Sequence, residues 1–402
     1  MRRRVALVVQ RYGLEVNGGA ELLCRMIAER LAHRHDIEVL TTCAIDYLTW
    51  ENEYPPGLSD LNGVAVRRFA VRHSRDVRKF SQYTAWLFKH PHTAAEERRW
   101  VDLQGPDPTA LANYVEAYGA GYDVFIFFTY LYATTQMVLP RVRDRALLVP
   151  TAHDEPPIYL GIYDELFRSP RRLLMSTPEE LDFVERRFCL DASASEIVGV
   201  GVDPWDEPAE DEVWSGIRRN AAGAPMVTYI GRIDESKGCA EMIEYFRRYC
   251  NDRPASRTVL LLIGTPAMPV PPHPAILTAG FVSEQTKRNA LRDSRVIVAP
   301  SLYESLSLVA LEAWMARKPL LANGRCAVLR GQCSRSNGGL WYSDYEEFRA
   351  CLDVLLENDA LSSTLGSQGH AYTVANYGWP RVEQRYDQLI EMIASGETGV
   401  HG

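Results

Sequence analysis

The chain has 402 residues, of which 46% are hydrophobic and 24% are charged, so it is long enough for two or three globular domains and is not disordered throughout. Its formal net charge is −8, from 44 Lys and Arg against 52 Asp and Glu. Proteins that wrap nucleic acid carry a basic surplus, so this composition excludes nucleic acid as an expected partner.

The first residues are not expected to form a targeting segment. Three arginines precede an apolar run over residues 5–9, which is too short for a signal peptide and is predicted to be a first buried strand. No apolar stretch approaches the ~20 residues that span a bilayer. We therefore expect a cytoplasmic protein, and a peripheral contact with the inner face of the membrane stays open.

The eight cysteines contain no C-x-x-C pair and are scattered through apolar or helical stretches. This distribution favours small core residues in a reducing compartment over a zinc site or a disulfide framework. We expect no metal.

The first half alternates short apolar runs with helical segments. A helix is predicted over residues 20–32, and strands are predicted over residues 5–9, 37–41, 64–71, 124–128 and 146–149. This alternation implies a parallel sheet covered by helices on both faces.

Residues 72–118 interrupt the alternation with many aromatic and charged side chains. We expect mostly helices there, lying over one rim of the sheet, with a turn over 104–109 that leads into a further helix. This segment is the expected acceptor surface, and a hydrophobic lid without substrate contact is an equal alternative.

Near residues 198–204 a Gly-rich strand end leads into an acidic stretch that contains Pro208 and Asp211. We interpret it as the connection between a first domain over 1–200 and a second over 201–379. The alternation then resumes, with strands predicted over 226–230, 258–263, 295–299 and 319–322, and helices over 240–249, 308–316, 346–357 and 380–393. Two doubly wound units imply a cleft, and ligands bind at the carboxyl ends of such strands, so the cleft is the expected active site.

The strongest chemical signal lies over residues 298–313. Glu304 follows a buried strand that ends at a Pro-Ser turn, Ser307 is placed to cap a helix, and Glu312 falls in the early part of that helix. Free backbone N–H groups at the helix start suit phosphate or sugar oxygens, and two carboxylates suit pairs of hydroxyl groups. The alternative is a helix stabilised by its macrodipole beside a solvated loop residue.

The second signal follows the first strand of the second half. Gly231 permits close backbone approach, and Arg232 and Lys237 place two cations at the carboxyl end of that strand. Fixed cations can stabilise the charge that grows on a leaving diphosphate, in place of a divalent metal. A surface loop with incidental ion pairs is the alternative.

Two further signals lie in the first half. Gly18 and Gly19, after Asn17, precede a helix and suit contact with an anion, although the absence of G-x-G-x-x-G disfavours an ordinary dinucleotide site and a tight turn without ligand is the alternative. His153 follows a strand and is a candidate donor to a sugar hydroxyl, oriented by Asp154 or Glu155, with a purely structural histidine as the alternative.

With these four segments the chain resembles the retaining glycosyltransferases of family 4, which have the GT-B fold of two Rossmann-like domains facing across a cleft. The resemblance rests on Glu304 and Glu312, separated by seven residues, and on Arg232 and Lys237 upstream of them. One departure is the segment 305–307, which reads Ser-Leu-Ser where the family often has Gly-Phe-Gly. A second is Gly264-Thr265-Pro266, where the family has Gly-x-Gly.

The resemblance implies roles for these residues. Glu304, His153, Arg232 and Lys237 would be catalytic, Glu312 would bind the ribose, and the final helix, 380–402, would pack back on the first domain. The nucleotide-sugar site would comprise Gly18, Gly19, Gly231, Arg232, Lys237, Phe281, Val282, Glu304, Leu306, Ser307, Leu308 and Glu312.

The implied activity is metal-independent, retaining transfer of a hexose from a nucleotide diphosphate sugar, which serves as co-substrate, to a hydroxyl acceptor. A cell-surface glycan or a lipid-linked saccharide is the expected acceptor, with a small molecule as a further option. Two alternatives remain: a sugar-nucleotide 2-epimerase on the same fold, which would turn over donor without acceptor, and a non-catalytic glycosyltransferase-like subunit, which would bind no nucleotide.

Overall fold

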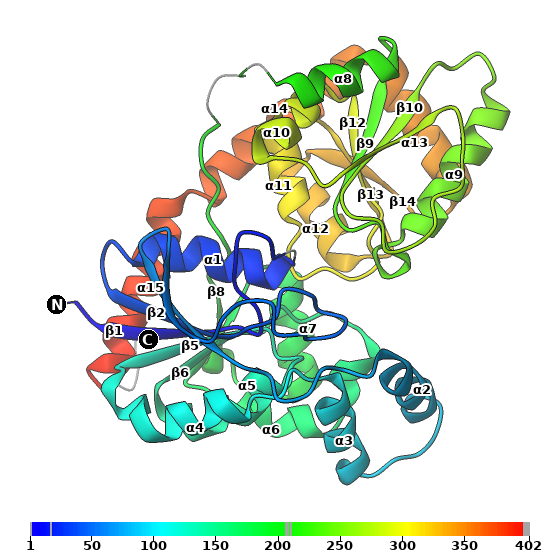
Figure 1. Cartoon of the computed structure of the whole chain (residues 1–402). Helices are drawn as coiled ribbons and strands as arrows, with labels where there is room; N and C mark the ends of the chain where they lie inside the picture. The colour runs from blue at the N-terminus through cyan, green and yellow to red at the C-terminus, as the bar shows by residue number, and fades with distance from the viewer. Residues whose placement is uncertain (1, 17, 206–208, 210, 397–402) are drawn as a thin grey trace. The chain divides into compact units, whose positions relative to one another are not determined.

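The structure is a computed structural model that describes residues 2–16, 18–205, 209 and 211–396. The chain forms two compact units (Figure 1): unit 1 comprises Met1–Val200 and Pro380–Gly402, and unit 2 comprises Gly201–Trp379. Pro208, in the stretch interpreted as the inter-domain connection, and Asn17 lie outside the described residues.

Unit 1 is built on an eight-stranded sheet with the order β3-β4-β2-β1-β5-β6-β7-β8. Every neighbouring pair is parallel except β3 and β4, which form an antiparallel hairpin. The strands are β1 (Arg4–Val8), β2 (Asp36–Thr42), β3 (Gly57–Leu61), β4 (Val64–Phe69), β5 (Val124–Phe128), β6 (Ala146–Val149), β7 (Arg172–Met175) and β8 (Ser195–Ile197). The chain goes from β1 to β2 on one side and later to β5 on the other, which makes a topological switch point between β1 and β5.

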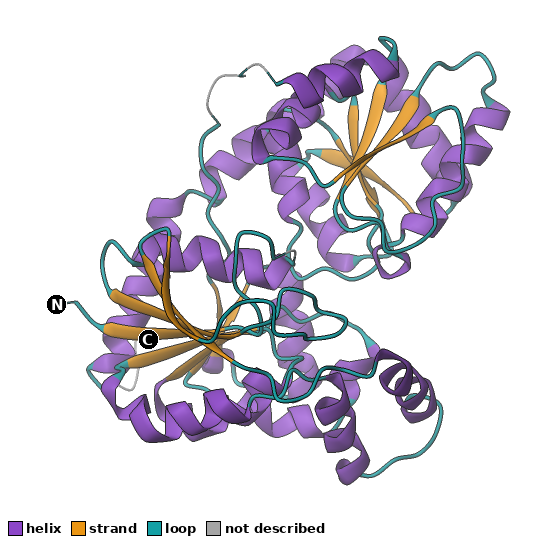
Figure 2. Ribbon diagram, viewed as in Figure 1, coloured by secondary structure: helices purple, strands orange, loops and turns teal. Residues whose placement is uncertain are grey.

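Helices cover both faces of this sheet (Figure 2). They are α1 (Gly19–Leu31), α2 (Val77–Leu87), α3 (Ala94–Gln104), α4 (Thr109–Tyr118), α5 (Ala133–Val138), α6 (Ile162–Arg168), α7 (Pro178–Phe188) and α15 (Trp379–Ala394). Polar caps fix several helix starts: the side chain of Asp76 accepts from Lys79 N, and Thr93 and Glu96 form a reciprocal capping box at α3. The helices predicted within 72–118 are therefore confirmed.

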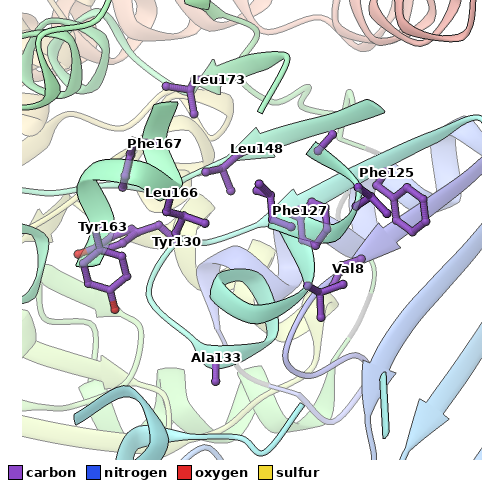
Figure 3. Close-up of a cluster of buried hydrophobic side chains, with 14 of the residues drawn as sticks. Val8, Phe125, Phe127, Tyr130, Ala133, Leu148, Tyr163, Leu166, Phe167 and Leu173 are labelled. Carbon is purple, nitrogen blue, oxygen red and sulfur yellow. The ribbon is translucent and has the colours of Figure 1, made fainter. Parts of the chain in front are cut away.

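The core of unit 1 lies between the sheet and its helices. All five residues of β5 are buried, as expected for a strand of a parallel sheet with both faces covered. Figure 3 shows Phe125 and Phe127 of β5 and Leu148 of β6 on one side of the sheet, with Leu166 and Phe167 of α6 among the side chains that complete the cluster.

The last helix, α15, is part of unit 1. Its apolar face is buried at positions that include Tyr386 and Ile390. Arg3 donates to Glu391 at 2.8 Å, and the imidazole of His35 lies 3.0 Å from Asp387. The residue before β1 and the turn before β2 therefore carry two of the partners of α15.

Unit 2 has a six-stranded, fully parallel sheet with the order β11-β10-β9-β12-β13-β14. Its strands are β9 (Met226–Ile230), β10 (Val259–Ile263), β11 (Ile276–Gly280), β12 (Val296–Ala299), β13 (Leu320–Asn323) and β14 (Gly339–Tyr342). Its helices are α8 (Glu212–Ala221), α9 (Cys239–Asp252), α10 (Glu284–Asp293), α11 (Leu308–Met315), α12 (Ala327–Ser336), α13 (Tyr345–Glu357) and α14 (Asp359–Asn376). The switch point of this sheet lies between β9 and β12.

The predicted fold class, two doubly wound α/β units, is confirmed, and each predicted strand falls within two residues of an observed one. The prediction missed β3, β7, β8, β11 and β14. The expectation that the cysteines are core residues is wrong for Cys189, which is exposed in a left-handed conformation at the end of α7. Over the described residues, no helix combines the length and apolarity that crossing a bilayer requires.

Candidate functional site

In unit 2 the switch point brings together two of the predicted segments. One loop follows β9 and carries Arg232 and Lys237, and another follows β12 and carries Glu304. The ammonium of Lys237 lies 2.9 Å from Glu304 Oε1. Because β9 and β12 are adjacent and parallel, their following loops leave the sheet at the same edge, which is where this fold class binds ligands.

Glycines make the close approach of these loops possible. Gly238 has φ of 73°, and a Cβ atom there would lie 2.2 Å from the carbonyl oxygen of Pro300. Gly264 has φ of 140°, and a Cβ there would lie 1.9 Å from the carbonyl oxygen of Gly231. Any other residue at 238 or 264 would separate the backbones, so the loop after β9 is confined between its two neighbours.

The backbone and side chain of Arg232 are both held. Its carbonyl oxygen accepts from the hydroxyl of Tyr229 at 2.7 Å, and its Nε lies 3.1 Å from Asp234 Oδ2. Burial raises the pKa of Asp234, but hydrogen bonds from Ser236 and the charge of Arg232 outweigh it and hold the pKa below its usual value. Asp234 is thus ionised at neutral pH and orients the guanidinium of Arg232, whose side chain is 34% exposed.

Glu312 is paired with a different cation. Lys287 of α10 lies 2.7 Å from Glu312 Oε1 and 2.9 Å from Glu284 Oε2. Burial lowers the pKa of Lys287, but the two carboxylates outweigh it and raise the pKa above its usual value. The prediction that Glu312 lies early in its helix is wrong: it is the fifth residue of the eight in α11, beyond the first turn where the helix dipole favours an acid.

The segment 305–308 forms the entrance to α11. The predicted cap is confirmed, because the Ser307 hydroxyl accepts from Ala310 N at 3.3 Å. Ser305 and Ser307 are buried, whereas Leu306 and Leu308 are half-buried. The Ser307 oxygen therefore serves the start of the helix by accepting one of its first N–H groups.

Phe281 and Val282 follow β11, at the carboxyl end of an outer strand of the same sheet. Gly280 ends the strand with φ of 68°. The Phe281 side chain is 66% exposed, whereas Val282 packs against the apolar cluster under α8. Of this pair, Phe281 alone presents a face that a flat ring can stack on.

In unit 1 the paired glycines differ from one another. A Cβ on Gly18 would lie 2.0 Å from Glu21 Oε2, whereas a Cβ on Gly19 would have no atom within 4 Å. Glu21 is buried, and its Oε1 accepts from Arg11 at 2.5 Å and from Gln10 at 2.8 Å. Gly18 therefore makes room for a carboxylate of the protein itself, and Gly19 is the glycine that faces open space.

His153 lies on the loop after β6. Its Nδ1 lies 3.0 Å from Glu155 Oε1, which also accepts from the Tyr130 hydroxyl at 3.1 Å. Of the two acids considered, Glu155 therefore orients the imidazole, while Asp154 accepts from Tyr159.

Sequence reasoning missed Glu180 beneath this loop. Its side chain is 2% exposed, and its two oxygens accept from Ala152 N and Ser176 N, each at 2.6 Å. Burial raises its pKa to about 7, against the hydrogen bonds of Ser176 and Ala152 and the charge of His153. The spacing of Thr177 and Glu180 was the available signal, since it has the form of a capping box.

The described residues contain no cluster of three or more His, Cys, Asp or Glu side chains placed to hold a metal ion. The charged groups at the carboxyl edge of the unit 2 sheet are instead ion pairs of opposite sign, Lys237 with Glu304 and Arg232 with Asp234.

Comparison with known proteins agrees with this geometry. Residues 224–358 match the family described as Glycosyl transferases group 1. The matched residues lie in unit 2 and include Arg232, Lys237, Glu304 and Glu312. A 127-residue stretch is 28% identical to the MMP alpha-(1->4)-mannosyltransferase of Mycolicibacterium hassiacum and spans 29% of this chain but only 30% of that protein.

Solved structures extend the fold comparison to almost the whole chain. Sucrose-phosphate synthase of Thermosynechococcus elongatus matches with a TM-score of 0.73 at 18% identity, over 98% of this chain and 100% of that one. HepE of Anabaena, solved with UDP and glucose, matches with a TM-score of 0.66 at 15% identity, over 97% and 100%. The two-unit architecture is that of GT-B glycosyltransferases.

Proposed function

We propose that this protein is a glycosyltransferase that moves a hexose from a nucleoside diphosphate sugar to a hydroxyl acceptor, with retention of configuration and without a metal ion. The contact between Lys237 and Glu304 carries the proposal. It places an acid and a base, with Arg232 on the same loop, at the switch point of the unit that matches the group 1 family.

The chemistry assigned to these residues is charge stabilisation. As the bond between the anomeric carbon and the diphosphate breaks, its electron pair passes to the leaving oxygen. Arg232 and Lys237 stabilise that growing negative charge. The acceptor oxygen then bonds to the anomeric carbon from the same face, and its proton passes to the departing phosphate, so no protein nucleophile is required.

The remaining residues bind and orient. Glu304, held by Lys237, accepts hydrogen bonds from hydroxyls of the donor sugar, and Glu312, held by Lys287, accepts them from the ribose. His153, whose Nδ1 is engaged by Glu155, is assigned a contact with a hydroxyl of the donor sugar. Phe281 offers its exposed ring to the base.

The donors to test first are suggested by the similar proteins. HepE was solved with UDP and glucose, and the Mycolicibacterium protein is named a mannosyltransferase, so UDP-glucose and the UDP and GDP sugars of mannose head the panel. The acceptor we propose is a glycan or a lipid-linked saccharide, with helices α2 and α3 of unit 1 as its surface and the inner face of the membrane as its location.

The deciding experiment combines binding and turnover. Calorimetric titration with a nucleotide panel should identify one preferred nucleoside diphosphate, and the wild type should hydrolyse the matching sugar nucleotide slowly, in the presence of EDTA, releasing the sugar with its original anomeric configuration. The double variant Arg232→Ala with Lys237→Ala should lose turnover while retaining its fold. Arg247→Ala, at a partly exposed position of α9 where Arg247 pairs with Glu244, should change neither.

Other outcomes would overturn the proposal. Undiminished turnover in the double variant would remove the assigned role of the cations. Conversion of the donor to a second sugar nucleotide without acceptor would indicate the epimerase instead. Failure to bind any nucleotide would indicate a non-catalytic subunit.

A further inference from the structure

Glu180 joins three segments of unit 1 at one buried point. It lies in the first turn of α7, and its carboxylate accepts one N–H from the loop after β6, at Ala152, and one from the end of β7, at Ser176. Both hydrogen bonds are 2.6 Å long and the side chain is buried, so water does not compete for these oxygens.

The loop that Glu180 holds has a backbone that needs support. Thr151 has φ of 47°, in the left-handed region that a β-branched residue rarely adopts. Ala152 follows it directly, and His153 comes next. The N–H that Glu180 binds therefore lies between the strained residue and the imidazole, where it controls the direction in which the His153 side chain leaves the backbone.

We infer that Glu180 is a positioning residue for His153, and that its ionised carboxylate fixes the loop after β6 in the conformation that presents the imidazole. This inference rests on the proposed function, because it assigns Glu180 a role in the reaction that His153 serves. The side chain of Glu180 is 2% exposed, so its role is to position the loop through Ala152 rather than to bind substrate.

The charge of Glu180 is what separates this role from simple packing. An ionised carboxylate accepts both N–H groups, whereas a protonated one has an O–H that must itself donate, which weakens one of the two contacts. His153 is the charged side chain that acts on Glu180 through space, and Ser176 and Ala152 act on it by hydrogen bonds. The pKa of about 7 places this change within the working range of an enzyme.

The test compares Glu180→Gln with Asp182→Asn, which removes the same charge from an exposed position on α7. The glutamine keeps one acceptor oxygen and turns an NH₂ group toward the other N–H, so one contact is lost at similar volume. In the glutamine variant kcat should fall at least tenfold while the dissociation constant for the nucleotide stays within twofold, because the predicted nucleotide contacts lie mainly in unit 2. We expect the wild-type kcat to fall below about pH 7 as Glu180 is protonated. This fall should be absent from the Glu180→Gln profile and present in that of Asp182→Asn.

Hydrogen–deuterium exchange provides a readout that does not depend on activity. Glu180→Gln should raise the exchange rate of residues 150–156 about tenfold and leave that of residues 226–238 unchanged. Asp182→Asn should change the exchange rate of neither segment. If the wild type acts on no sugar nucleotide, the proposed function fails, while the exchange result still tests whether Glu180 holds the loop after β6. Unchanged exchange over 150–156, or an acid limb that persists in Glu180→Gln, would overturn the inference.

Discussion

Lys237 Nζ lies 2.9 Å from Glu304 Oε1, although 67 positions separate the two residues in the chain. The contact arises because β9 and β12 are neighbours at the centre of the unit 2 sheet while two strands lie between them in the sequence. The pair is partly exposed, with 36% of the lysine side chain and 17% of the glutamate side chain reaching solvent. Such a pair contributes little to stability, so its removal tests a role in the reaction without unfolding the protein.

Lys237→Met should separate activity from folding. Loss of one fixed donor to a developing anion lowers kcat by roughly 10²–10³-fold in enzymes that depend on it. The loss of stability should stay below about 1 kcal/mol, because the pair is partly exposed. Initial-rate kinetics and thermal melting of Lys237→Met, with Arg247→Met as the control, measure both effects. A variant that melts far lower, or that keeps full kcat, would contradict the assignment.

Lys287→Met should behave differently, because Lys287 is more deeply buried, with 14% of its side chain exposed, and holds two carboxylates. Its removal leaves Glu312 without its cation, and breaking a buried pair costs about 3–5 kcal/mol, a range to be discounted here for partial exposure. The pKa of Lys287 is raised, so the ion pair contributes below the usual lysine pKa and is lost only as the pH rises above it.

The expected result for Lys287→Met is therefore a lower melting temperature by the same amount at pH 6 and at pH 9, with weaker nucleotide binding. Scanning fluorimetry at both pH values and calorimetric titration with the preferred nucleotide measure these effects. A deficit that disappears by pH 9 would show that the ion pair is not its source.

The two glycines before α1 provide a matched pair. Gly18→Ala places a methyl group 2.0 Å from Glu21 Oε2 and should displace that carboxylate from Arg11, with a large loss of stability. Gly19→Ala meets no atom within 4 Å and should leave stability unchanged or slightly higher, since alanine favours the helix.

Donor kinetics complete the comparison of the glycines. If the donor diphosphate approaches the start of α1, as the family resemblance implies, Gly19→Ala should raise KM for the donor without changing the melting temperature. Unchanged KM in a fully stable Gly19→Ala would leave the glycine pair with a structural role alone, the tight turn considered from the sequence.

Glu180 predicts an unusual dependence of stability on pH. Its pKa rises from 4.5 to about 7 on folding, so between these values the folded chain binds more protons than the unfolded chain. Stability therefore falls as the pH rises through this window, and at about 1.4 kcal/mol per pKa unit the contribution is on the order of 3 kcal/mol. Melting temperatures of the wild type and Glu180→Gln between pH 5 and pH 8 should diverge in slope, and parallel curves would contradict the pKa shift.

The sequence alone predicted the parts of the fold that have strong local signals. Buried runs such as 124–128 and 226–230 coincide with β5 and β9, because strands covered on both faces must be continuously apolar. The missed strands lack that signal. Strand β3 is exposed along most of its length and is held by its pairing with β4, and β8 has only three residues, so tertiary contacts define both.

The candidate site was predicted to a similar extent. The identities of Arg232, Lys237 and Glu304 were read from loops after strands, but the partner of each depends on strand order, which no local pattern contains. Glu180 was missed for the same reason: its capping-box spacing predicts a bond to the backbone of Thr177, whereas the carboxylate binds Ser176 and the distant Ala152.

The membership of α15 in unit 1 has a consequence for biosynthesis. Unit 2 is one continuous stretch of chain, whereas unit 1 is completed by residues that are synthesised after unit 2. Until Tyr386 and Ile390 emerge, the apolar surface that they cover on the nascent N-terminal unit is exposed to water. A chain truncated at residue 379 should therefore contain a complete second unit and an unfinished first unit with an exposed apolar surface.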